Sequence, residues 1–178
     1  RVLIATARAG NVIGGGDWSD GRLIPDIVKA TDKSEVVTIR SPKSIRPWQH
    51  VLESLSAYLH IGQGLLNENL NHASEWNVGP SDNEHLTVQE VLEKSHEYWP
   101  KIDFEINSNN DLHEAKLLML DTSKIKSELG WSSIWDADKA ISTTIKWYEN
   151  FYQNKQVNTS KDLNSYIQEA ILKKAIWT

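Results

Sequence analysis

The chain has 178 residues, 39% of them hydrophobic and 24% charged, and its formal net charge is -5. A single domain of this size buries a sizeable core without disulfide bonds, and the absence of cysteine excludes both a disulfide framework and a thiol nucleophile. The mild acidity argues against a nucleic-acid or anionic-membrane partner, which a basic patch would bind. We find no apolar run of about 20 residues and no signal-peptide pattern, so we expect a cytoplasmic protein without a membrane span.

An alternating order of strands and helices begins at the first residues. The continuous apolar run over residues 2–7 predicts a strand that is covered on both faces, and the glycines at 10 and 14–16 predict a loop after it. Because the chain starts with Arg1 and enters this strand directly, we expect it to be part of a longer polypeptide. Apolar residues at helical spacing predict a short helix over residues 23–31, with Pro25 in its first turn.

The next elements surround a Ser-Pro-Lys turn at residues 41–43. Residues 36–40 and 47–51 are predicted to be short strands, and an apolar stripe over 52–66 predicts a helix of about four turns. In the second half, residues 75–78, 101–106 and 116–120 are strand candidates. Thr87 and Glu90 have the spacing of a capping box for a helix ending near Trp99, and Gly130 is typical of a helix C-terminus. Further helices are expected over residues 121–129, 136–152 and 160–175.

Two arginines and two ring side chains follow one another closely between residues 40 and 50. Arg40 and Arg46 lie on either side of the Ser-Pro-Lys turn, and Trp48 and His50 alternate with Arg46, which would place the last three on one face of a strand. A guanidinium binds a phosphate through two parallel hydrogen bonds, and an indole offers an apolar wall to a base or sugar. The pattern suits a nucleoside diphosphate, although a solvated turn with a structural tryptophan has the same composition.

Several short motifs occur in an order and at a spacing that resemble the C-terminal half of the extended short-chain dehydrogenase/reductase family. They are Asn11-Val-Ile-Gly14, Arg22-Leu-Ile-Pro25, Arg46-Pro-Trp-Gln-His-Val51, Trp76-Asn-Val-Gly-Pro80, His113-Glu-Ala115, and Leu120-Asp-Thr-Ser-Lys124 followed by Leu129-Gly-Trp131. Within the family the 8–18 and 46–50 segments look most like the CDP-glucose 4,6-dehydratases. The resemblance covers nearly all of this chain but about half of a family member.

This resemblance implies an α/β fold, the C-terminal part of a Rossmann-like extended short-chain dehydrogenase/reductase with a small mixed α/β substrate-binding lobe. Residues 1–35 would be a remnant of the dinucleotide-binding sheet with the loop and helix that follow it, and residues 36–178 mainly the substrate lobe and the C-terminal helices. The cofactor would be NAD, bound mainly by the missing N-terminal half, with Ala9 as the contact from this chain.

The catalytic motifs of the family are absent from the sequence. No tyrosine has a lysine four residues later, so the Tyr-x-x-x-Lys pair that the family uses to oxidise the sugar is missing, and no G-x-G-x-x-G follows the first strand. We therefore assign no catalytic residue and expect this chain alone to be inactive. Its six histidines have no metal-site spacing, so no metal ligand is predicted either.

The substrate-binding residues carry over from the resemblance position by position. Asn11 corresponds to an asparagine that binds the sugar or its phosphate, Arg22 and Leu23 to the start of a helix over the nucleotide, and Arg46 to the arginine that grips the diphosphate. Val37, Thr38 and Ile39 would flank the base. These assignments have plain alternatives. Asn11 could be a turn asparagine, Arg22 a solvated arginine, and residues 37–39 a core strand. Trp48 and His50 would complete the wall, or belong to the core or the rim.

Glu114 corresponds to an acid that binds the ribose hydroxyls. The arginine that usually accompanies it is missing, and His113 is a candidate replacement. The predicted partners are a CDP-sugar substrate and either the missing N-terminal half or another copy of the chain, with a homo-oligomer expected for the intact protein. The predicted function is the substrate-binding portion of a nucleotide-sugar 4,6-dehydratase. A non-catalytic nucleotide-sugar-binding domain, or a relative acting as an NAD-dependent epimerase or reductase, remains the alternative.

Overall fold

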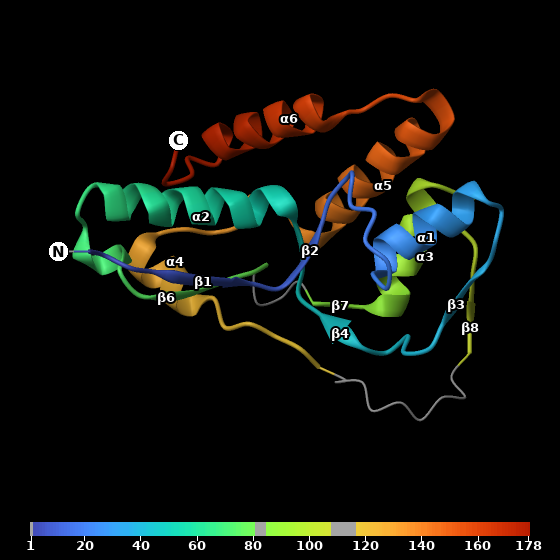
Figure 1. Cartoon of the computed structure of the whole chain (residues 1–178), viewed down its shortest axis with the longest axis horizontal. Helices are drawn as coiled ribbons and strands as arrows, with labels where there is room; N and C mark the ends of the chain where they lie inside the picture. The colour runs from blue at the N-terminus through green and yellow to red at the C-terminus, as the bar shows by residue number, and fades with distance from the viewer. Residues whose placement is uncertain (1, 81–84, 108–116) are drawn as a thin grey trace.

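The computed structural model describes residues 2–80, 85–107 and 117–178. The fold is mixed α/β, as the alternating pattern predicted (Figure 1). In chain order the first half contains β1 (Thr6–Ala9), β2 (Asn11–Ile13), α1 (Leu23–Asp32), β3 (Val37–Ile39), β4 (Ile45–Arg46), β5 (Trp48–His50), α2 (Val51–Leu66) and the short 3-10 helix η1 (Leu70–His72). The second half contains β6 (Glu75–Val78), β7 (Leu86–Thr87), α3 (Val88–Tyr98), β8 (Phe104–Ile106), α4 (Ser123–Leu129), α5 (Ala137–Asn154) and α6 (Thr159–Leu172).

The strands of the described residues associate in pairs. Three pairs are parallel, β1 with β6, β2 with β5 and β3 with β8, while β4 pairs with β7 in antiparallel orientation. The registers align Thr6 with Glu75, Asn11 with Trp48, and Arg46 with Leu86. Parallel strands need a long connection, and the segments between these partners contain the helices. Strands that are distant in sequence are therefore neighbours in space.

Three strand predictions were wrong in detail. The first strand begins at Thr6, because its partner β6 begins opposite that residue, and Val2 and Ile4 before it are 83% and 71% exposed. Residues 11–13 form β2, where a loop was expected. Residues 117–120 form no strand and share a single bridge, from Leu117 to Ile45, while residue 116 lies outside the described part of the chain.

Three helix ends lie where local chemistry predicted them. Thr87 accepts a hydrogen bond from the Glu90 amide and the Glu90 carboxylate accepts one from the Thr87 amide, which completes the capping box of α3. Asp136 caps α5 through the Lys139 amide at 2.7 Å. Gly130 ends α4 with a φ of 68°, a left-handed conformation that glycine adopts without a Cβ penalty. These interactions lie within one turn of each helix end, so they depend little on the rest of the fold.

The largest hydrophobic cluster lies between α1, α3 and α5, which sit together on one side of the molecule in Figure 1. Its fully buried members come from all three helices and from the segment before β8, and they include Ile27, Val28, Leu92, Ile102, Ile141, Ile145 and Tyr148. Each such side chain contributes about 1.5–3 kcal/mol when it leaves water. This cluster holds α1 in place beside β3, and the N-terminus of α1 faces the site described below.

The opposite side of the molecule is built around β1, β6, α2 and α4, with α6 lying beside α2 (Figure 1). Glu53 of α2 is completely buried there and accepts hydrogen bonds from the Ile134 and Trp135 amides at 2.9 and 2.7 Å and from the Tyr166 hydroxyl at 2.9 Å. Burial raises the pKa of this carboxyl to about 7 although the Trp135, Ile134 and Tyr166 hydrogen bonds and the Lys173 charge oppose it. One carboxylate thus ties α2 to α6 and to the loop before α5.

Candidate functional site

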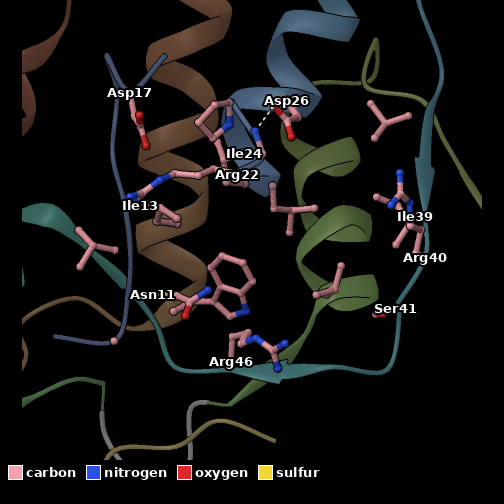
Figure 2. Close-up of a pocket in the computed structure, with 18 of the residues that line it drawn as sticks. Asn11, Ile13, Asp17, Arg22, Ile24, Asp26, Ile39, Arg40, Ser41 and Arg46 are labelled. Atoms are coloured by element: carbon pink, nitrogen blue, oxygen red, sulfur yellow. Dashed lines mark hydrogen bonds between the residues drawn. The ribbon is translucent and has the colours of Figure 1, made fainter. Parts of the chain in front are cut away.

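A cavity of about 740 Å³ opens between the N-terminus of α1 and the strands β2, β3, β4 and β5 (Figure 2). Its volume is that of a site for a nucleotide-sized ligand. The lining residues come from segments that are distant in sequence: Gly10, Asn11, Val12, Ile13, Gly14, Asp17, Gly21, Arg22, Leu23, Ile24, Pro25, Asp26, Val37, Thr38, Ile39, Arg40, Ser41, Arg46, Trp48 and Val88.

Most of the predicted substrate-binding residues line this one cavity. They are Asn11, Arg22, Leu23, Val37, Thr38, Ile39, Arg46 and Trp48. Pairing of β2 with β5 sets Asn11 directly beside Trp48, and the packing of α1 against β3 and α5 brings Arg22 and Leu23 to the same opening. The structure therefore brings these residues together in space, while their roles in binding stay a prediction.

Arg46 and Trp48 are held by β7. Arg46 lies opposite Leu86 in the β4–β7 pair, and the Trp48 indole donates a hydrogen bond to the Leu86 carbonyl at 3.2 Å. Arg46 is 9% exposed, and its Nη1 donates to the Ile45 carbonyl at 2.9 Å. A cation with so little access to water interacts strongly with an anion in the cavity. Figure 2 shows the Arg46 side chain extending from β4 into the cavity.

The N-terminus of α1 forms another wall. Arg22 is its N-cap residue, in an extended conformation, and makes no side-chain cap hydrogen bond. The first-turn amides of Leu23 and Ile24 precede Pro25, whose ring suits this turn and carries no N–H. The Asp26 carboxylate accepts a hydrogen bond from the Gly21 amide at 3.2 Å, so the preceding turn is tied to the helix. A helix start of this kind favours an anion.

The loop over residues 14–18 closes the cavity on the side of α5. The buried Tyr148 hydroxyl donates to the Asp17 carbonyl at 2.6 Å and lies 3.3 Å from the Gly14 carbonyl. Trp18 packs against α5 through Tyr148 and Phe151, with ring centroids 5.4 and 5.1 Å apart. Burial tends to raise the pKa of Asp17, but hydrogen bonds from Ser19 and the charges of Arg22 and Lys29 lower it below its usual value. Asp17 is therefore a carboxylate at neutral pH.

Other predicted residues lie elsewhere. His50 is outside the cavity lining, and the expectation of one strand face shared by Arg46, Trp48 and His50 was wrong. The chain changes partner at Pro47, since β4 pairs with β7 and β5 pairs with β2. His50 Nδ1 instead accepts a hydrogen bond from the Leu52 amide at 3.3 Å, and its ring packs against Trp135 at 5.0 Å. Burial lowers the pKa of His50 to about 4, so the ring is neutral.

The remaining predicted residues are Ala9, the expected cofactor contact, and the expected ribose contacts His113 and Glu114. Ala9 lies half-buried at the carboxyl end of β1, opposite Val78 of β6, and does not line the cavity. Ligands of open α/β sheets bind beyond the carboxyl ends of the strands, so its position suits the cofactor contact that stays predicted. His113 and Glu114 lie outside the described residues.

Sequence reasoning missed several side chains that the fold adds to the lining. Asp17, Asp26, Ser41 and Val88 all line the cavity. Arg40, which the sequence pattern paired with Arg46 without giving it a role of its own, lines the cavity as well. Val88 had no signal in the sequence, because it reaches the cavity only through the packing of α3. No group of histidine and acidic side chains suited to a metal ion occurs among the residues that the structure describes. In the same part of the chain, no helix combines the length and apolar character needed to cross a bilayer.

Comparisons with known proteins show which proteins this chain is similar to. A CDP-glucose 4,6-dehydratase from Salmonella typhimurium is 38% identical over 169 residues, which is 93% of this chain and 47% of that enzyme. The chain thus spans about half the length of this curated relative, and it corresponds to its C-terminal half. No protein-family model matches the chain.

Solved structures share the fold at low sequence identity. A UDP-glucose-4-epimerase from Stenotrophomonas maltophila with bound NAD and formylated UDP-arabinopyranose has a TM-score of 0.69 and 20% identity, over 85% of this chain and 49% of that one. A dTDP-glucose 4,6-dehydratase from Bacillus anthracis in complex with NAD has a TM-score of 0.66 and 21% identity, over 82% and 44%. The chain is therefore similar over nearly its whole length to the C-terminal half of a CDP-glucose 4,6-dehydratase, with the fold of the corresponding part of the extended short-chain dehydrogenases/reductases.

Proposed function

We propose that this chain is the substrate-binding portion of an NAD-dependent nucleotide-sugar 4,6-dehydratase that acts on CDP-glucose in the cytoplasm, in the synthesis of surface sugars such as the lipopolysaccharide O-antigen. The observation that carries the proposal is the gathering of Asn11, Arg22, Arg46 and Trp48 around one cavity. The curated relative supplies the nucleotide and sugar, since its name specifies CDP-glucose.

The chemistry of the cavity matches the parts of such a substrate. Two phosphates carry negative charge, and Arg46, Arg22 and the first amides of α1 are the donors that bind it. The apolar wall includes Val37, Ile39 and Trp48, which suit the faces of a base. Asn11 lies beside Trp48 and offers both a donor and an acceptor to sugar hydroxyls or phosphate.

NAD fits this chain only in part. After β1 the chain passes directly into β2, with no glycine-rich turn leading into a helix N-terminus, which is the structure that binds a pyrophosphate in dinucleotide-binding folds. The described residues therefore do not form a complete dinucleotide site, and we assign Ala9 as their contact with a cofactor held mainly by the N-terminal half. Without the Tyr-x-x-x-Lys pair, the isolated chain does not turn over CDP-glucose when NAD is added. Turnover by the purified chain would contradict this part of the proposal.

The binding part of the proposal is tested by titrating the chain with CDP in a calorimeter. Arg46→Ala is expected to weaken CDP binding by about tenfold to hundredfold, because a hydrogen bond to a charged group is worth about 1.5–3 kcal/mol. Arg8→Ala removes an exposed arginine that lies outside the cavity lining and is the matched control, with unchanged affinity expected. Unchanged CDP affinity in Arg46→Ala, with the fold intact by circular dichroism, would contradict the assignment of this cavity.

A further inference from the structure

Arg40 is the arginine of the cavity lining that adjoins the apolar strand β3. It follows Ile39 directly, and Ile39 is 6% exposed while the Arg40 side chain is exposed to the opening. Figure 2 shows Arg40 on the β3 wall, across the cavity from Asn11 and Asp17. Arg22 and Arg46 stand on other walls, at the start of α1 and on β4. Arg40 is thus separated from the two arginines that we assign to the diphosphate.

The backbone around Arg40 is held on both sides. Before it, the Val37 amide donates to the Asp103 carbonyl at 3.2 Å, and the Asn107 amide donates to the Ile39 carbonyl at 3.0 Å. After it, the Ser44 amide donates to the Ser41 carbonyl, and the Gln89 amide donates to the Pro42 carbonyl at 2.9 Å. Within the described part of the chain, the Arg40 guanidinium makes no hydrogen bond or ion pair. A fixed backbone therefore presents a cation whose donors are available to a ligand.

Pyrimidine bases differ in the hydrogen-bonding groups that they would present to a guanidinium next to β3. A guanidinium carries N–H donors and no acceptor. Cytosine presents two neighbouring acceptors, O2 and N3, which match two parallel N–H groups. Uracil and thymine carry a hydrogen on N3, so the same approach sets a donor against a donor. A bidentate arginine contact to a base edge is worth about 1–3 kcal/mol of discrimination.

We infer that Arg40 determines the base specificity of the cavity by donating two hydrogen bonds to O2 and N3 of cytosine, so that CDP binds in preference to UDP. This inference rests on the proposed function, because it places the base against β3. It adds a specificity-determining residue that the phosphate-binding assignment does not require. The parallel pairing of β3 with β8 directs Val37 and Ile39 backbone groups toward β8, which leaves the opposite edge of β3 to face the ligand.

The test compares calorimetric dissociation constants for CDP and UDP, two ligands that share their phosphates and ribose and differ in the base. The full chain is expected to prefer CDP by about tenfold or more. Arg40→Ala is expected to lose CDP affinity to the level of UDP, with UDP affinity nearly unchanged. Arg40→Lys keeps the charge but has no planar pair of donors, so it is expected to lose the preference as well.

Lys43→Ala is the matched control, because it removes an exposed cation three residues away that does not line the cavity, and its preference for CDP should be kept. Equal weakening of CDP and UDP in Arg40→Ala would overturn the inference, since it would make Arg40 a phosphate contact. Equal affinity of the unmutated chain for the two ligands would also overturn it but would leave the proposed function standing. If the folded chain bound neither ligand, both the proposed function and this inference would fail.

Discussion

Around the cavity, Arg22 and Arg40 are exposed, whereas both oxygens of the buried Glu53 carboxylate accept hydrogen bonds from the protein itself. Glu53 has a strongly raised pKa, a property often used to locate active sites, yet its donors come from Ile134, Trp135 and Tyr166 and none of its surroundings belong to the cavity. The perturbed pKa of Glu53 therefore marks a residue that holds α2, α6 and the loop before α5 together. The candidate site is marked instead by charged groups whose backbones are fixed and whose side chains face the cavity.

The largest expected effect is a loss of stability when the buried Glu53 carboxylate is removed. Glu53→Ala would leave the Ile134 and Trp135 amides without an acceptor in a buried region, so we expect a loss of about 3 kcal/mol or more of unfolding free energy. Urea denaturation followed by circular dichroism measures it. Glu97→Ala, which removes an exposed glutamate on α3, is the control and should change stability by less than about 0.5 kcal/mol. A loss of similar size in both variants would show that Glu53 has no special role.

The pH dependence of stability is the next largest effect. Burial raises the pKa of Glu53 from 4.5 to about 7, so between these values the folded state binds more protons than the unfolded state, and the contribution of Glu53 to stability falls as the pH rises. At about 1.4 kcal/mol per pH unit over most of this interval, the fall amounts to about 3 kcal/mol. It should appear in urea denaturation at pH 4.5 and pH 7.5 as a difference between the chain and Glu53→Gln, which cannot titrate. Parallel pH profiles would mean that the folded carboxyl titrates normally.

A smaller effect tests the loop over residues 14–18 that closes the cavity. A Cβ at Gly15 would lie 2.2 Å from the Trp147 ring, and that ring is held by its hydrogen bond to Thr159 at 2.9 Å and by stacking on Phe151. Gly15→Ala should therefore displace the loop that carries Asp17, costing about 1–2 kcal/mol of stability and several-fold in CDP affinity.

Gly64→Ala provides the comparison from the other region, because its Cβ would meet the His72 ring at 2.1 Å. It should destabilise the chain similarly while leaving CDP affinity unchanged. Gly62→Ala, whose Cβ meets nothing within 4 Å, controls for the substitution itself. Thermal unfolding and calorimetric titration of the three variants separate the two regions. Loss of CDP affinity in Gly64→Ala to the same extent would show that the regions are coupled.

The helices and their ends were predictable because their determinants are local. Thr87 and Glu90 are three residues apart and complete a capping box in any tertiary setting, and Gly130 ends α4 for a reason intrinsic to glycine. The strands were predicted less well. Residues 11–13 were taken as part of a loop because glycines lie on both sides of them, and they form β2 only through their partner β5.

The sequence by itself determined the α/β class, the family resemblance and the residues most suited to bind a nucleoside diphosphate, since these depend on composition, motif order and side-chain chemistry. Only the tertiary structure decided which of them meet. The change of strand partner at Pro47 separates Arg46 in β4 from Trp48 in β5, and His50 at the end of β5 caps α2 while Trp48 lines the cavity. Packing of α1 and α3 adds Asp26 and Val88 to the lining. Strand pairing and helix packing join residues that are far apart in the chain. The free energy of those contacts therefore cannot be predicted from a local sequence pattern.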